Sequence, residues 1–226
     1  RDLIARLPDR SFARIADLGC GAGNVTRLLA EKFPDAQITG VDTSPEMLEA
    51  ARKELPDASW VQADLAAWQP AAPPDLVFTN ATLQWLPDHT RLLPRLLGLL
   101  APGGVLAVQV PDMDHHPFRR LITEGAAESP WRDTLAAMPG LGRILSPAAY
   151  YDVLAPLAAG LDLWSTEYMH VLEGEHPVLE WVKGAALRPV LTALEGAERE
   201  AFVATYGARL KPHVRPQGDG RTLLFF

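Results

Sequence analysis

The chain has 226 residues, of which 48% are hydrophobic and 22% charged, and its formal net charge at pH 7 is -7. This composition is typical of a globular protein and excludes a disordered chain, and no apolar run approaches the roughly 20 residues of a membrane span. The acidic balance argues against nucleic acid as the main partner, because phosphate binding depends on Lys and Arg. The single cysteine, Cys20, cannot form an internal disulfide, so we expect a cytoplasmic protein that is stable through packing alone.

The first half of the chain alternates short apolar runs with amphipathic stretches, which is typical of βαβ units and a parallel sheet. The strands are expected over residues 14–18, 37–42, 59–63, 75–80 and 105–110. Between the second and third of these strands, Ser44 suits an N-cap and Pro45 suits the first turn of a helix that extends to about residue 55.

After residue 110 the pattern changes to mostly helical segments. Helices are expected over 147–157 behind an N-cap Ser146, and over 177–194 and 197–210, with strands over 161–172 and 221–226. The stretch 176–211 would then be a helical insertion near the C-terminus. These elements predict an α/β fold whose seven-stranded, mostly parallel sheet has an antiparallel last strand and helices on its flanks.

Three alternating glycines follow the first expected strand. Gly19, Gly21 and Gly23 allow a tight turn and let a ligand approach the backbone closely. A dinucleotide fingerprint has the spacing G-x-G-x-x-G, whereas here the spacing is G-x-G-x-G, with Asp17 two residues before the first glycine and Asp42 at the end of the second strand. This set resembles the signature of S-adenosylmethionine-dependent methyltransferases.

Polar side chains stand at the ends of successive strands, where a parallel sheet binds ligands. The Asp42 carboxylate can accept hydrogen bonds from two vicinal ribose hydroxyls, and Asp64 can accept one from the adenine amine. Each residue alone also fits a structural role: Asp17 a loop cap, Asp64 a turn residue, Trp85 core packing. Together they favour a cofactor site made of Asp17, Gly19, Cys20, Gly21, Gly23, Asn24, Asp42, Thr43, Met47, Asp64, Leu65, Asn80, Ala81 and Trp85.

Nearly the whole chain resembles the trans-aconitate 2-methyltransferase family. The similar stretches are residues 16–24, 38–47, 80–88 and 150–152, Trp164, Tyr168, His170, 181–184 and 187–189. The resemblance implies a Rossmann-like enzyme that transfers a methyl group from S-adenosylmethionine to one carboxylate of trans-aconitate, with S-adenosylhomocysteine as the second product. It also implies one methyltransferase domain over 1–226, with a cofactor-binding half at 1–112 and a substrate-side half at 113–226.

The implied chemistry needs no catalytic side chain. A carboxylate with a pKa near ~4 is already ionised at neutral pH, so proximity and orientation would carry the reaction without a general base or a metal. A tricarboxylate needs cationic partners, and Arg188 is the first choice because its guanidinium can bind a carboxylate through two hydrogen bonds. Taken by itself, Arg188 would be a helix-end cation. The full set of expected substrate residues is Gln84, Trp85, Tyr168, His170, Lys183 and Arg188.

Other polar clusters are weaker candidates. Asp114, His115 and His116 invite a metal interpretation, but a third spaced ligand is missing, and we expect a solvated loop that could contact substrate. The basic pair Arg119 and Arg120 is expected to be surface.

The sequence departs from the family's pattern at three places. Met113 follows Pro111-Asp112 where the family often has Asn, only the tail of an N-terminal cofactor-covering segment corresponds to residues 1–7, and the last strand stops at Phe226. Because the chain also starts at Arg1 without a methionine, we expect both ends to continue in a longer protein.

Three alternatives stay open at this point. One is a methyltransferase for another carboxyl substrate, such as a malonyl thioester on a carrier protein, which would need a basic docking surface. The second is a nicotinamide-dependent oxidoreductase, disfavoured by the glycine spacing. The third is an S-adenosylmethionine-binding protein without activity. The oligomeric state is not readable from the sequence.

Overall fold

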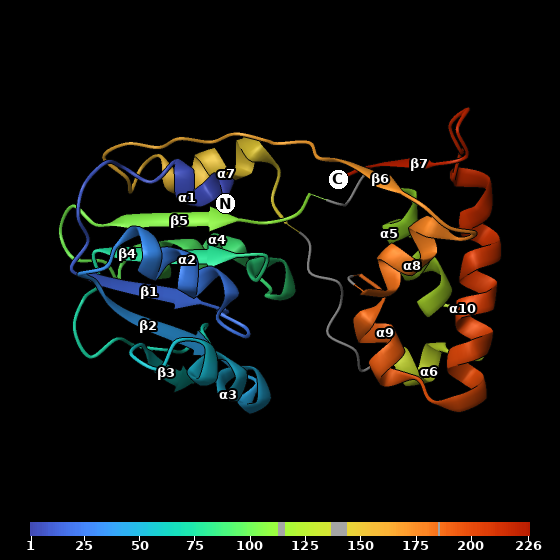
Figure 1. The fold of residues 1–226 in the computed structure, drawn as a ribbon, viewed down its shortest axis with the longest axis horizontal. Helices are drawn as coiled ribbons and strands as arrows, with labels where there is room; N and C mark the ends of the chain where they lie inside the picture. Colours follow the sequence, from blue (N-terminus) through green and yellow to red (C-terminus); the bar gives the residue numbers. More distant parts are fainter. Residues whose placement is uncertain (113–115, 137–143, 185) are drawn as a thin grey trace. The chain divides into compact units, whose positions relative to one another are not determined.

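The computed structural model describes residues 1–112, 116–136, 144–184 and 186–226, and the chain forms two compact units (Figure 1). The first unit comprises Arg1–Val110 and Gly142–Leu163, and the second comprises Pro111–Leu141 and Trp164–Phe226. The chain therefore leaves the first unit after its fifth strand, returns to it with residues 142–163, and leaves it again. The expected single domain, with halves that meet at residue 112, stays a prediction.

A parallel sheet forms the centre of the first unit (Figure 1). Its order is β3-β2-β1-β4-β5, and Asp17 on β1 pairs in register with Gly40 on β2 and with Phe78 on β4. The bounds are β1 Arg14–Leu18, β2 Gln37–Asp42, β3 Ser59–Gln62, β4 Leu76–Asn80 and β5 Val105–Gln109. All five strands agree with the predicted ones to within one residue at either end.

The two faces of β1 pack against different helices. Ala16 and Leu18 are buried in a cluster with Leu93 and Leu96 of α4 (His89–Leu97). Asp17 points the other way and accepts a hydrogen bond from Thr26 of α2 (Asn24–Lys32). Successive strand residues point to opposite faces, so this alternation covers both sides of the sheet with helices.

The helices of the first unit begin where the sequence offers caps. Ser44 and Ser146 each accept a backbone N–H through the side-chain oxygen, at 3.2 Å, as predicted for the starts of α3 and α7. The bounds are α1 Asp2–Ala5, α2 Asn24–Lys32, α3 Pro45–Glu54, the short 3-10 helix η1 Leu83–Trp85, α4 His89–Leu97 and α7 Pro147–Leu154.

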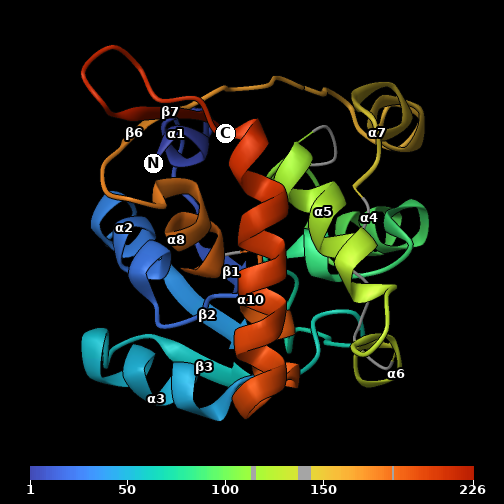
Figure 2. The same ribbon diagram turned by 90° about the vertical axis from the view of Figure 1, so that its right-hand side faces the viewer.

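The second unit has a helical core of its own. Its long helix α10 packs against α5 (Figure 2). The Tyr206 hydroxyl donates to the Phe118 carbonyl at 3.1 Å, and Phe202 meets Trp131, the residue before α6, edge to face. The bounds are α5 Pro117–Ala126, α6 Arg132–Leu135, β6 Met169–Leu172, α8 Pro177–Gly184, α9 Arg188–Ala193, α10 Gly196–Leu210, η2 Lys211–His213 and β7 Thr222–Phe225.

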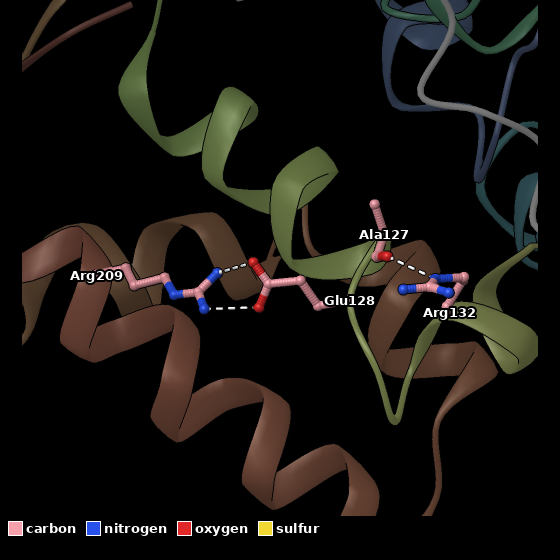
Figure 3. Close-up of polar contacts among 4 residues, drawn as sticks. All are labelled: Ala127, Glu128, Arg132 and Arg209. Carbon is pink, nitrogen blue, oxygen red and sulfur yellow. Dashed lines mark hydrogen bonds and ion pairs between the residues drawn. The ribbon is translucent and has the colours of Figure 1, made fainter.

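Charged contacts fix the end of α5 (Figure 3). Arg209 near the end of α10 donates from both terminal nitrogens to the two oxygens of Glu128, at 2.8 and 2.7 Å, and this partner lowers the pKa of Glu128. Beside it, Arg132 Nε donates to the Ala127 carbonyl at 2.9 Å. The connection from α5 to α6 is thereby held against α10.

The Rossmann-like class is as predicted, but the strands are arranged differently. Within the described residues, β6 and β7 pair with each other in a separate antiparallel sheet instead of completing one sheet of seven. The expected strand 161–172 is shorter, because β6 begins only at Met169. The expected helix 177–194 is two helices, since Pro189 lacks the backbone N–H that a continuous helix needs at that point.

In the described part of the chain, no helix is long and apolar enough to cross a membrane.

Candidate cofactor and substrate site

The order of the strands reverses between β1 and β4. The chain proceeds from β1 to one side of the sheet and returns to the other side with β4, and such a switch point is where open α/β sheets bind ligands. Two loops leave the sheet there: the glycine loop, residues 19–23, and the β4 loop, residues 81–88. They touch, because the Thr82 hydroxyl donates to the Gly19 carbonyl at 3.3 Å.

The glycine loop needs glycine for two reasons: its backbone is left-handed, and at Gly19 there is no room for a side chain. Gly19, Gly21 and Gly23 have φ of +73°, +53° and +82°, in the left-handed region that disfavours other residues. A Cβ on Gly19 would lie 2.2 Å from two side-chain atoms of Thr82, whereas a Cβ on Gly21 would meet no atom within 4 Å. The loop is thus packed tightly at Gly19 and open at Gly21, and a ligand can approach the backbone at Gly21.

Asp42 is held in place by the backbone on both sides. The Gly21 N–H donates to its Oδ2 and the Ser44 N–H to its Oδ1, each at 2.9 Å. A carboxylate has about four lone-pair positions, so two acceptor positions remain for a ligand. The carboxylate predicted to bind the ribose is therefore rigid and still able to accept two hydroxyl hydrogen bonds.

Asp17 and Cys20 are buried behind the glycine loop. Burial raises the pKa of Asp17 to about 6, the Thr26 hydrogen bond of 2.6 Å lowers it in part, and the Asp42 carboxylate raises it further. Burial together with Asp17 and Asp42 raises the pKa of the Cys20 thiol to about 12. A protonated, buried thiol is unreactive at neutral pH, so Cys20 contributes to the loop through its backbone and its packing.

The loop after β3 presents Asp64 at the same edge of the sheet. The Ala63 N–H donates to the Asp42 carbonyl at 3.0 Å, which sets the two strand ends side by side. The exposed Asp64 accepts the Ala66 N–H at its Oδ1, at 2.8 Å. From α4, the Arg95 guanidinium donates to the carbonyls of Leu65 and Trp68 and fixes the shape of this loop.

The β4 loop is strained at both ends. Ala81 and Asp88 have φ of +53° and +54°, which is uncommon for residues other than glycine and is often found at functional sites. Gln84 Nε2 donates to the Ala81 carbonyl at 2.7 Å, and this side chain is only 7% exposed. The predicted substrate residue Gln84 is thus used to shape the loop, while Trp85 is 43% exposed at its surface.

The other predicted cofactor residues lie at the same ends of the strands. Asn24 begins α2 and is exposed, Asn80 ends β4, and Leu65 is buried under the loop after β3. Thr43 and Met47 flank the Asp42 turn: the Thr43 carbonyl accepts Gln62 Nε2 at 3.2 Å, and the Met47 N–H donates to Ser44. Within the first unit, the structure therefore brings the predicted cofactor residues to one edge.

The remaining predicted substrate residues lie in the second unit. Tyr168 exchanges two backbone hydrogen bonds with Phe226, and the His170 ring lies 5.9 Å from that of Trp181 and 5.7 Å from that of Phe226. Lys183 forms an ion pair with Glu180 at 2.7 Å. Arg188 is the exposed first residue of α9.

The metal hypothesis for Asp114, His115 and His116 falls largely outside the described residues, which include only His116 of the three. His116 precedes α5, and its ring is stacked on Phe118 at 4.8 Å. The described residues contain no group of three or more His, Cys, Asp or Glu side chains that could hold a metal ion.

Sequence reasoning missed several residues that shape the site. Thr82 fills the space beside Gly19, and Arg95 supports the Asp64 loop from a helix 30 residues further along the chain. His89, which is buried beneath the β4 loop, was also missed. Its position as the first residue of an apolar helix could have indicated a buried polar contact. These contacts depend on how distant segments pack, which a local pattern does not show.

Comparison with known proteins assigns the chain to a family. Residues 15–104 match a family described as "Methyltransferase domain". Proteins named "Trans-aconitate 2-methyltransferase" from Methylobacterium radiotolerans and from Azoarcus sp. are each 49% identical to the chain, over 100% of it and 88% of their own length. This chain belongs to the trans-aconitate 2-methyltransferase family. The predicted S-adenosylmethionine-dependent methyltransferase is thereby confirmed.

A solved structure of an S-adenosylmethionine-dependent methyltransferase from Mesorhizobium loti is 33% identical, over 46% of this chain and 49% of that one, with a TM-score of 0.42. The family assignment rests on the relatives that match along the whole chain.

Proposed function

We propose that this family member methylates one carboxylate of trans-aconitate and forms a monomethyl ester. The observation that carries the cofactor half of the proposal is the Asp42 carboxylate, fixed by Gly21 and Ser44 beside the open face of the glycine loop. The substrate half is supported by the name shared by relatives that match the whole chain at up to 49% identity.

In this proposal the first unit would bind S-adenosylmethionine. Asp42 would accept the two ribose hydroxyls, and Asp64 the adenine amine, each with acceptor positions that its backbone contacts leave open. The other cofactor residues proposed at this edge are Asp17, Gly19, Cys20, Gly21, Gly23, Asn24, Thr43, Met47, Leu65, Asn80, Ala81 and Trp85. When bound, S-adenosylmethionine supplies an electrophilic methyl group and leaves as S-adenosylhomocysteine.

The protein's part in the reaction is to bind and orient. A substrate carboxylate oxygen would form the new bond to the methyl carbon, and the carbon–sulfur bond would break with its electron pair on sulfur, so the protein would have no proton to move. The substrate carboxylate is ionised at neutral pH, and the chain needs no general base. Alignment and partial exclusion of water would account for the acceleration.

The second unit supplies the proposed cationic partners of the substrate. Arg188 is exposed, and its guanidinium makes no ion pair with any described residue, so it is available for a carboxylate. Lys183, His170 and Tyr168 belong to the same unit and are proposed as further contacts, with Gln84 and Trp85 from the β4 loop. Lys183 would have to exchange its partner Glu180 for substrate.

The proposal is tested by measuring S-adenosylhomocysteine formation with a panel of di- and tricarboxylates. Trans-aconitate should give the highest kcat/KM, and saturated tricarboxylates of the same charge should be poorer. Binding of S-adenosylhomocysteine without turnover of any carboxylate in the panel would reject the substrate class and leave the cofactor assignment intact.

A further inference from the structure

A buried histidine connects the β4 loop to a helix distant in the sequence. His89 is 2% exposed, its Nε2 lies 2.7 Å from the Leu83 carbonyl, and its Nδ1 lies 2.7 Å from the Tyr150 hydroxyl. Leu83 begins η1, which carries Gln84 and Trp85. Tyr150 lies on α7, in the segment that returns to the first unit after residue 142.

The partners fix the tautomer of the ring. A carbonyl oxygen only accepts hydrogen bonds, so Nε2 of His89 carries the proton and donates to Leu83. In the neutral ring Nδ1 is then an acceptor, and the Tyr150 hydroxyl donates to it. Both ring nitrogens are satisfied, which explains how the protein tolerates a histidine at this depth.

The hydrogen bond from His89 to the Leu83 carbonyl stabilises the strained β4 loop. The β4 loop has left-handed backbone at Ala81 and Asp88, and Asp88 stands directly before His89. The Leu83 carbonyl also accepts the Leu86 N–H at 2.9 Å, which closes η1. A strained loop keeps its conformation where surrounding residues hold it in place. His89 is one of these residues, because its ring bonds to the Leu83 carbonyl of the loop.

We propose that His89 and Tyr150 are positioning residues for methyl transfer. Tyr150 orients the His89 ring, and the ring holds the Leu83 carbonyl so that η1 presents Trp85 in one conformation beside the reacting groups. The ribose and adenine contacts come from Asp42 and Asp64 on other strands, so the pair affects the transfer step more than the affinity for the cofactor. The reaction that is positioned rests on the proposed function, whereas the link between α7 and the loop does not.

The variant that isolates the link is Tyr150→Phe, which removes the hydroxyl and keeps the ring that packs 5.9 Å from His89. Its kcat should fall about three- to tenfold, while KM for S-adenosylmethionine stays within about twofold of wild type. The kcat is calculated from the concentration of S-adenosylhomocysteine-binding sites, measured by calorimetry, so that unfolded protein does not affect it. The matched control is Tyr151→Phe, since the neighbouring Tyr151 is 56% exposed, and its kcat should not change.

A double-mutant cycle tests whether Tyr150 acts through His89. His89→Ala should lower kcat at least as much as Tyr150→Phe, and adding Tyr150→Phe to it should change little, because the bond between the hydroxyl and the ring is then already absent. His89→Gln keeps an amide donor within reach of Leu83, and we expect it to recover part of the loss. Effects that multiply in the double variant would overturn the proposed pathway.

Amide hydrogen exchange gives a readout that does not depend on the substrate. In Tyr150→Phe, exchange of the Leu86 amide should become about tenfold faster, while the amide of Ala16 in the centre of β1 stays as protected as in wild type. Equal acceleration at both would show general destabilisation and overturn the proposal, as would no change at either. If wild type methylates no carboxylate, the proposed function fails, and this exchange experiment still decides the role of the pair.

Discussion

Asp42 illustrates how one side chain joins backbone geometry to ligand recognition. Two N–H groups hold the carboxylate in a single orientation, so little side-chain freedom is lost when a ribose binds. Asp42→Ala removes the acceptor, and we expect S-adenosylmethionine binding to weaken by about 1–3 kcal/mol. Calorimetry measures this, with Asp57→Ala, an exposed aspartate outside the site, as the control. Unchanged affinity in Asp42→Ala would remove Asp42 from the ribose site.

Asp17 gives a prediction about pH. Its pKa is raised from 3.8 to about 6 in the folded protein, mainly by burial, so the folded state binds the proton more tightly than the unfolded chain. The contribution of Asp17 to stability is therefore complete below about pH 4 and is lost as the pH rises through about 6. Between pH 7 and 5, wild type should gain about 1 kcal/mol in unfolding free energy relative to Asp17→Asn. Denaturant unfolding at the two pH values measures this, and a constant difference would contradict it.

At the scale of elements, the contact between the glycine loop and the β4 loop depends on the absence of a side chain at Gly19. Gly19→Ala would place a methyl group 2.2 Å from Thr82 in addition to straining a φ of +73°, and we expect it to cost about 2–4 kcal/mol of unfolding free energy. Gly103→Ala is the matched control, because Gly103 has a φ of +74° but no neighbour within 4 Å, so only the backbone strain of about 1 kcal/mol remains. Equal losses in the two variants would show that the loop contact is unimportant.

The elements that the sequence predicted well are those with local signals. The bounds of β1 and β2 agree with the predicted ones, and Ser44 and Ser146 cap helices as expected, because strand alternation and capping act over a few residues. The break between α8 and α9 was missed although Pro189 marked it. The Tyr150–His89 contact joins residues 61 positions apart and has no local signature. The pairing of β6 with β7 also depends on packing within the second unit.

At the scale of the whole molecule, the proposed site residues are distributed over the two units. The first holds the residues proposed for the cofactor, whose place at successive strand ends could be predicted because parallel strands end at one edge. The second holds Tyr168, His170, Lys183 and Arg188, which were chosen from the resemblance and from charge. A common contact of these four side chains with one substrate would depend on tertiary arrangement, so no pattern in the sequence could establish it.

Arg188 tests the contribution of the second unit to substrate binding. Arg188→Lys keeps the charge but loses the planar pair of donors, so KM for trans-aconitate should rise about tenfold while KM for S-adenosylmethionine stays within about twofold. Steady-state kinetics measures both, and Arg215→Lys, a change of the same kind at another exposed arginine, should alter neither. Equal increases in both KM values would argue against a substrate contact.

The most direct test of the central claim is transfer of a labelled methyl group. The protein is incubated with S-adenosylmethionine labelled in the methyl group and with trans-aconitate, and the products are identified by mass spectrometry. We expect a labelled trans-aconitate monomethyl ester in equal amount to S-adenosylhomocysteine. Recovery of unlabelled trans-aconitate from a protein that binds S-adenosylhomocysteine would contradict it.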